Sequence, residues 1–237
     1  QQNSNPQKTL IPGTPAKRPM KRLIKFLTFL LILYWSDLAW SMDNERAIVN
    51  AIQKNYESVL TFKANFEQKA FVKMMNRVEV AQGEVQIKKP GKMKWVYNSP
   101  DPQVLISNHK NLWLYLPEDQ QVTRMPIESV YSANTPALFL AGKGTLTDTF
   151  NVEQVLPDKN KITVVFIPKE KNSNLSRLVL RTNKNNYQIT GASVYDKLGN
   201  KTDINFREIR INEKIAESVF EFQVPAGVET QDFTPNP

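Results

Sequence analysis

The chain has 237 residues, enough for one large domain or two small ones, and its composition already restricts its chemistry. It carries a formal net charge of +8, but residues 1–41 hold six basic groups and one acidic group, so the other 196 residues carry only +3. The charge therefore gives little support to a nucleic-acid partner, and we expect none. The chain has no cysteine and a single histidine, His109, which excludes disulfides, thiolate metal sites and cysteine nucleophiles. We expect a binding protein and no enzyme, with no catalytic residue, no metal and no cofactor.

The N-terminal residues predict export. Residues 1–19 are polar and predict a disordered extension. A basic segment, Met20–Lys25, precedes an apolar run of ten residues, Phe26–Trp35, and small residues follow near Ser41. This pattern predicts a signal peptide over residues 20–41, cleaved near Ser41-Met42, and a folded domain over residues 42–237. An uncleaved anchor is the weaker alternative, because the run is short of the roughly 20 residues that span a bilayer. We therefore expect a periplasmic protein.

An amphipathic helix is expected at the start of the folded domain. Asp43, Asn44 and Glu45 offer a capping residue and acidic groups for the first turn. An apolar stripe with three- and four-residue spacing follows, formed by Ile48, Ile52, Tyr56, Val59 and Leu60. The helix should end near Leu60, because the hydrophobic period changes to two after it.

Alternating residues and recurrent turn signals then predict about eleven β-strands without βαβ crossovers. The expected segments are Phe62–Val72, Val78–Lys88, Met93–Tyr97, Gln103–Ser107, Leu112–Leu116, Gln121–Met125, Phe150–Leu156, Ile162–Ile167, Leu175–Arg181, Gln188–Tyr195, Thr202–Ile211 and Val219–Val224. Such a chain predicts an antiparallel sheet curled on itself, with a few helices.

A short apolar helix interrupts the strands. Thr135 is a suitable cap, Pro136 a first helical residue and Gly142 a C-terminal stop. Between them, Ala137–Ala141 contains Leu138 and Phe139. This segment is either a lid over the sheet or an ordinary core helix, and the sequence favours neither.

The strand faces predict an apolar interior. Val85 and Ile87 share one face of their strand, and Met93, Trp95 and Tyr97 share one face of the next. These side chains form either a packed core or a lipid cavity, and periodicity alone does not decide between them.

Other candidate chemistry is weak. His109 lies in a predicted turn, where a triad or metal site would need partners that converge on a hairpin end. Gly142–Thr145 lacks the order of a phosphate-binding loop. The carboxylates alternate outward on strands, and the basic cluster Lys88–Lys94 alternates with inward residues, which indicates a solvated outer face.

Several segments, in this order, resemble the periplasmic outer-membrane lipoprotein carrier (LolA) family. They are Phe66–Gln68, Gly83–Tyr97, Ile106–Asn108, Leu112–Tyr115, and Asn134–Pro136 with Leu138. The resemblance implies a mainly β fold: an incomplete, strongly curved antiparallel β-barrel of about eleven strands, with a helical lid and an N-terminal helix. It also implies a chaperone that takes acylated lipoproteins from an inner-membrane ABC transporter complex and delivers them to an outer-membrane receptor lipoprotein. A monomer is expected.

The same resemblance implies site residues. The expected lipid-binding residues are Val85, Ile87, Met93, Trp95, Tyr97, Leu138 and Phe139. Lys89 matches a position where family members often carry an arginine that bonds to the backbone of the lid, so it is the expected lid latch. A lysine cannot reproduce the planar fork of arginine, which weakens that expectation.

Three other functions compete with this one. The first is another periplasmic lipid- or lipoprotein-binding module, a sensor or glycolipid carrier, on the same half-barrel. The second is an outer-membrane barrel protein, disfavoured because its outward residues are charged. The third is an exported hydrolase, which would depend on His109.

Overall fold

The structure is a computed structural model that describes residues 44–127, 145–171 and 173–234. The chain divides into two units, Gln1–Glu45 and Arg46–Pro237. The predicted extension and signal peptide lie outside the described residues, as does the predicted lid helix at residues 135–142. The account below therefore concerns the second unit.

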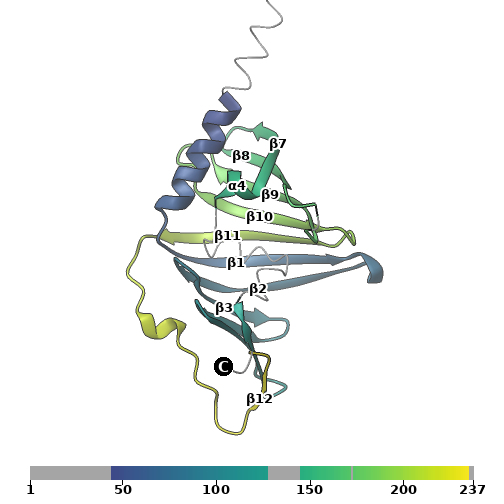
Figure 1. Ribbon diagram of the computed structural model, residues 1–237, viewed down its shortest axis with the longest axis vertical. Helices are drawn as coiled ribbons and strands as arrows, with labels where there is room; N and C mark the ends of the chain where they lie inside the picture. Colours follow the sequence, from purple (N-terminus) through teal and green to yellow (C-terminus); the bar gives the residue numbers. More distant parts are fainter. Residues whose placement is uncertain (1–43, 128–144, 172, 235–237) are drawn as a thin grey trace, which may run out of the picture. The chain divides into compact units, whose positions relative to one another are not determined.

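A twelve-stranded sheet forms most of the described part of this unit (Figure 1). Its strands are β1 Thr61–Val72, β2 Arg77–Lys88, β3 Lys92–Ser99, β4 Gln103–Asn108, β5 Asn111–Leu116, β6 Gln121–Pro126, β7 Phe150–Pro157, β8 Lys161–Pro168, β9 Leu175–Asn183, β10 Ile189–Asp196, β11 Lys201–Ile211 and β12 Glu229–Asp232. The sheet is curved and unclosed, with β12 and β7 at its two edges. The predicted mainly β class and open curved sheet are thus confirmed.

The strand order places the first strand, β1, beside β11 in the middle of the sheet. The order is β12-β6-β5-β4-β3-β2-β1-β11-β10-β9-β8-β7. The long strands β1 and β11 pair antiparallel at the centre, with Phe66 opposite Phe206. Strands β1 to β11 pair antiparallel throughout, whereas the short β12 pairs parallel with β6. The predicted antiparallel sheet is confirmed for β1 to β11, and β12 adds one parallel pair at its edge.

A helix extends over residues 44–58, and its part in the second unit packs on the sheet through Val49 and Ile52. The structure confirms the predicted stripe at Ile52, Tyr56 and Val59, which join the hydrophobic core of the inner face. Leu60 is an exception, because it lies beyond the last helical turn and its exposed fraction is 63%. A short helix, α4 Leu146–Thr149, is capped by the Thr145 hydroxyl and is tied to the first helix by Gln53, whose side chain accepts a hydrogen bond from the Leu146 N–H (2.8 Å).

The C-terminal segment departs from prediction. The prediction of a strand at Val219–Val224 is wrong. A 3-10 helix, η2 Glu217–Phe220, occupies the first part of this segment, and residues 221–225 pair with no strand of the described sheet. Phe220 is buried, and Phe222 lies 6.2 Å from the Trp113 ring and 5.9 Å from the Tyr115 ring. The alternation of aromatic residues therefore reflects a segment that packs on the face of β3–β5 instead of pairing with an edge. The chain rejoins the sheet only at the polar strand β12.

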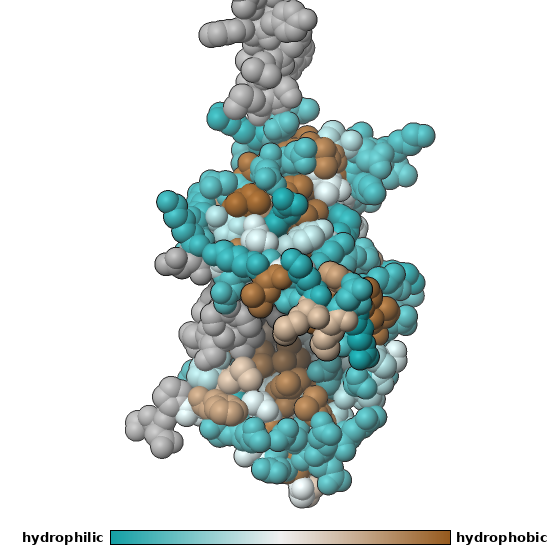
Figure 2. Space-filling model, turned by 90° about the vertical axis from the view of Figure 1, so that its right-hand side faces the viewer, coloured by the Kyte–Doolittle hydropathy of each residue, from teal (hydrophilic) through white to brown (hydrophobic). Residues whose placement is uncertain are grey.

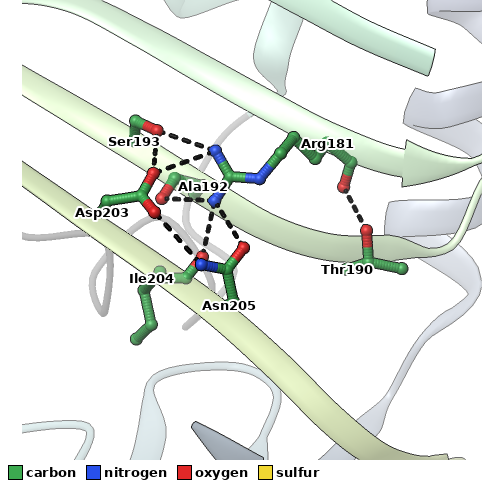
Figure 3. Close-up of polar contacts among 7 residues, drawn as sticks. All are labelled: Arg181, Thr190, Ala192, Ser193, Asp203, Ile204 and Asn205. Carbon is green, nitrogen blue, oxygen red and sulfur yellow. Dashed lines mark hydrogen bonds and ion pairs between the residues drawn. The ribbon is translucent and has the colours of Figure 1, made fainter. Parts of the chain in front are cut away.

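A polar cluster ties β9, β10 and β11 together on the face opposite the core (Figure 3). Arg181 on β9 forms an ion pair with Asp203 on β11 (3.0 Å) and donates to the Ser193 hydroxyl on β10 (2.8 Å). Its other terminal nitrogen donates to the Ile204 carbonyl and to the Asn205 side chain (2.8 and 3.1 Å). One guanidinium thus holds three strands in register on the outer face.

Candidate functional site

Two strands present the predicted apolar residues to the same interior. On the inner face of β2 and β3, Val85 is opposite Trp95 and Ile87 is opposite Met93. All four side chains are at most 1% exposed. These residues lie together because paired residues of β2 and β3 point to the same face, and the pairing is regular from Gly83 to Lys88.

Aromatic rings extend this interior across β1. The Phe66 ring makes edge contacts with Trp95 (5.0 Å between centroids) and with Tyr97 (4.9 Å). Gly83 makes this arrangement possible, because a Cβ atom there would lie 2.9 Å from the Phe66 ring and 1.9 Å from the Val96 carbonyl oxygen. On the other side of Trp95, Phe206 of β11 lies at 6.4 Å. The inner face therefore has aromatic walls from both halves of the chain.

Two polar groups lie within these apolar walls. The Tyr97 hydroxyl donates to the Gln68 side chain (3.3 Å), and burial raises the pKa of Tyr97 to about 12, so the phenol stays neutral at physiological pH. The Trp95 Nε1–H is buried and has no hydrogen-bond partner among the residues that the structure describes. A buried donor without an acceptor is unfavourable, and it would gain a bond from any carbonyl oxygen that reached it.

A pocket opens at one end of this apolar region. It is a shallow depression between the end of the first helix, the start of β1 and the end of β2. Its walls include Tyr56, Val59, Phe62, Ile87 and Ile189. Such walls suit an aliphatic ligand. Figure 2 views the molecule from the side of the β1–β2 and β10–β11 hairpin ends, away from this pocket, and shows further apolar side chains in a hollow bordered by hydrophilic ones.

Lys89 adds a cation to this pocket. Its ammonium donates to the Tyr56 backbone carbonyl and lies 3.5 Å from the centroid of the Tyr56 ring. Burial lowers the pKa of Lys89 to about 8, against the nearby Glu57 carboxylate, which raises it. An ammonium group held this way can meet a polar or anionic group at the mouth of an apolar pocket.

Comparison with known proteins decides the family. The family model "Outer membrane lipoprotein carrier protein LolA" matches residues 57–223. The chain belongs to the LolA family. It is 27% identical to the outer-membrane lipoprotein carrier protein of Methylobacillus flagellatus, over 87% of this chain and 98% of that protein. It is 30% identical to the protein of the same name from Hahella chejuensis, over 81% and 91% of the two chains.

A solved structure supports the fold. An uncharacterized conserved protein from Thermus thermophilus aligns over 80% of this chain and 99% of its own, with 11% identity and a TM-score of 0.51. A curved sheet of this kind is thus found in another protein of very different sequence.

The structure places the predicted site residues of this LolA-family chain unevenly. Val85, Ile87, Met93 and Trp95 come together in the interior, and Tyr97 lies half-buried at its margin. Leu138 and Phe139 lie outside the described residues. The contact of Lys89 is with the first helix, and its predicted role as a latch on the lid remains a prediction.

Sequence reasoning did not assign Phe62, Gln68 or Phe206 to the site. The two phenylalanines contact each other (5.2 Å between centroids), and both were accessible from the alternation of their strands. Gln68 gave no signal, because a polar residue on an inner face is recognisable only once its partner, Tyr97, is placed.

The described residues hold few other candidates for chemistry. His109 lies in the turn between β4 and β5 with φ 81°, as predicted. Within residues 44–127, 145–171 and 173–234, no group of three or more His, Cys, Asp or Glu side chains could hold a metal ion. In the same ranges, no helix has both the length and the apolar character needed to cross a membrane.

Proposed function

We propose that this chain is a periplasmic lipoprotein chaperone, which binds the acyl chains of lipoproteins on the apolar inner face and releases them to an outer-membrane receptor. The observation that carries the proposal is the apolar interior of Val85, Ile87, Met93 and Trp95, continuous with a pocket beside Lys89. Family membership and the names of the relatives, outer-membrane lipoprotein carriers, support the same role.

The chemistry of the site suits binding and handover. Acyl chains need a dry apolar wall, and the ester or amide carbonyls at their head need donors. The Trp95 N–H is such a donor, and the Lys89 ammonium is another at the pocket mouth. Neither group needs to change covalently, so the proposed cycle is one of binding and release, without catalysis.

Energetics limit how the cargo is held. Burying a methylene contributes about 0.8 kcal/mol, so three fully buried chains of about fifteen methylenes would contribute on the order of 36 kcal/mol. Noncovalent affinities reach a limit near about 18–21 kcal/mol. The inner face is at most 1% exposed at Trp95 and Met93, so an acyl chain reaches it only if covering groups move aside. Part of the burial energy would then open the protein, and the remainder would leave a cargo that can be released.

The proposed partners follow from this cycle. Acylated lipoproteins would arrive from an inner-membrane ABC transporter complex and leave to a receptor lipoprotein at the outer membrane, with a monomer acting in the periplasm after removal of residues 20–41. The predicted lid residues, Leu138 and Phe139, would also contact the acyl chains.

The test is release of an acylated lipoprotein from inner-membrane vesicles by the purified protein. We expect a soluble complex with the acylated lipoprotein and none with the same protein lacking its acyl chains. Equal recovery of both forms would contradict the proposal. A second experiment is mass spectrometry of the ligands that co-purify with the protein from the periplasm. A bound glycolipid would support the alternative function as a glycolipid carrier.

A further inference from the structure

The end of the β1–β2 hairpin carries an exposed apolar cluster that the carrier role does not use. The two strands are joined by the 3-10 helix η1 Lys73–Met75. Met74 is 95% exposed, Met75 62% and Val78 56%. The turn between β10 and β11 adds Leu198, which is 78% exposed. Figure 1 shows both hairpins ending on the same side of the sheet. We call residues 69–80 and 196–201 the tip surface.

The tip surface is ordered by specific contacts. The β1–β2 register continues to the last pair, Val72 opposite Arg77, and Asn76 closes the turn with φ 47°. The Lys73 N–H donates to the Asn200 side chain (2.9 Å), which joins the two hairpin ends. The Lys73 side chain lies against Gly199, where a Cβ atom would be 2.5 Å from the lysine Cδ. The exposed methionines are therefore carried by a turn whose backbone conformation is fixed by these contacts.

The charges around these methionines are mostly positive. The tip surface contains five basic side chains, Lys69, Lys73, Arg77, Lys197 and Lys201, and two acidic ones, Glu79 and Asp196. Two of the five form ion pairs with a carboxylate two residues away, Lys69 with Glu67 (3.0 Å) and Arg77 with Glu79 (3.8 Å). Among the described residues, the other three lysines form no ion pair. The Lys197 ammonium donates to the Lys171 carbonyl (2.7 Å) and the Lys201 ammonium lies 5.6 Å from the centroid of the Tyr195 ring, so neither of these contacts neutralises the charge in an ion pair.

We propose that the tip surface docks the protein onto an anionic bilayer, with Met74 and Met75 entering the interfacial layer and the surrounding lysines lying against lipid phosphates. Isolated exposed apolar residues are common, but a cluster with a basic rim is typical of an interaction site. A projecting hairpin end that carries flexible methionines matches a deformable lipid interface. Each lysine near an anionic surface adds to this attraction. The proposal is independent of cargo binding, because the tip surface shares no residue with the apolar interior.

The test uses a probe at a single position. The chain has no cysteine, so Met74→Cys carries one environment-sensitive fluorophore, and Asn185→Cys, in the turn at the opposite end of β9 and β10, is the matched control. With phosphatidylcholine–phosphatidylglycerol vesicles, the Met74 probe should shift to a less polar environment and the Asn185 probe should not. With phosphatidylcholine alone, the shift should be much smaller, and added salt should reverse it.

Two further variants define the outcome. Lys197→Gln should weaken partition into the anionic vesicles roughly fivefold, as expected for one lysine at such a surface. Met75→Glu should abolish the probe's shift while lipopeptide binding without vesicles is unchanged. A Met74 probe that stays as polar as the Asn185 probe at saturating vesicles would overturn the proposal. A shift that needs an added protein and no lipid would also overturn it, in favour of a protein partner. Loss of lipopeptide binding in the unmodified chain would instead contradict the carrier function alone.

Discussion

Trp95 and Lys89 are polar groups set in apolar surroundings, and each is placed by a neighbour on a different element. The Trp95 ring contacts Phe66 of β1, while its N–H has no acceptor within the described part of the chain. The Lys89 ammonium is held by the carbonyl and ring of Tyr56 at the end of the first helix. A ligand could accept a hydrogen bond from the Trp95 N–H, and it could replace Tyr56 as the partner of the Lys89 ammonium.

Substitution of Trp95 tests the apolar interior directly. In Trp95→Glu, a carboxylate would replace a side chain that is 1% exposed, and burying it unpaired is unfavourable by several kcal/mol. We expect a variant that folds poorly or binds no acylated lipopeptide, as measured by urea unfolding and by co-elution. The control is Lys94→Glu on the opposite face of the same strand, which should keep both properties. Normal folding and normal binding of Trp95→Glu would place Trp95 outside the binding surface.

Lys89 gives a prediction on pH. Its pKa is about 8 in the folded protein and 10.5 as the ordinary value, so the unfolded chain binds more protons between these values. The stability contribution of Lys89 therefore rises as the pH rises through this window. The difference in free energy of unfolding between the unmodified protein and Lys89→Met should therefore rise, in favour of the unmodified protein, from about pH 7 to about pH 9.5. Urea titrations at several pH values measure this difference. A constant or falling difference would mean that Lys89 is solvated in solution.

At the scale of elements, the C-terminal segment is attached to the sheet at separate points. Hydrogen bonds from Lys88 and from Lys92 hold the pKa of Glu217 at about 2, so this carboxylate stays charged and bridges β2 and β3. Phe220 follows it and is buried, with η2 against β3 and β4. Further along, Asp232 pairs with Arg124 of β6 (3.2 Å). Burial of one aromatic ring is the strongest of these attachments.

Truncation of that ring should show its contribution. Phe220 is 1% exposed, and Phe220→Ala should lower the free energy of unfolding by about 3–5 kcal/mol, as expected for a buried phenylalanine. Phe233 in the same segment is 64% exposed, and Phe233→Ala should change stability by less than about 0.5 kcal/mol. Urea unfolding of both variants measures the difference. Similar values for the two would show that η2 detaches from the sheet in solution.

The same segment explains where sequence reasoning succeeded and failed. Alternation predicted β1 to β11 because each of these strands buries one face, and it placed Val85, Ile87, Met93 and Trp95 in one interior. Phe220 and Phe222 alternate in the same way, yet a strand also needs a hydrogen-bonding partner, which a sequence pattern does not report. Strand β12 is exposed at every residue and so has no apolar signal. The pocket beside Lys89 depends on how the helix meets the sheet, which no local pattern encodes.

At the scale of the whole unit, residues far apart in sequence must meet before the interior exists. The pairing of β1 with β11 joins residues about 140 positions apart, such as Phe66 and Phe206, and both rings lie beside Trp95. Such non-local pairing is slow to form but makes the interior a property of the complete sheet. Carboxylates lie at several of the long-range connections, including Glu217 to β2 and β3, Asp232 to β6, and Asp203 to β9. The stability of the sheet should therefore depend on their ionisation.

Asp203 gives the sharpest form of this dependence. Burial tends to raise the pKa of Asp203, but the hydrogen bonds from Ser193 and Asn205 and the charges of Arg181 and Lys201 together lower it below the ordinary 3.8. A carboxylate with a lowered pKa stabilises the fold above its ordinary pKa, and this contribution is lost as the pH falls through the folded value. Asp203→Asn should be less stable than the unmodified protein at neutral pH, because Arg181 loses its counterion, and the gap should narrow as the pH falls from about 5 to about 2. The control variant is Asp119→Asn, in the exposed turn between β5 and β6, where no ion pair is formed within the described residues. Urea titrations across this pH range measure the free energy of unfolding of both variants and of the unmodified protein. If the stability difference for Asp203→Asn does not change with pH, the Arg181–Asp203 pair does not link β9 to β11 in solution.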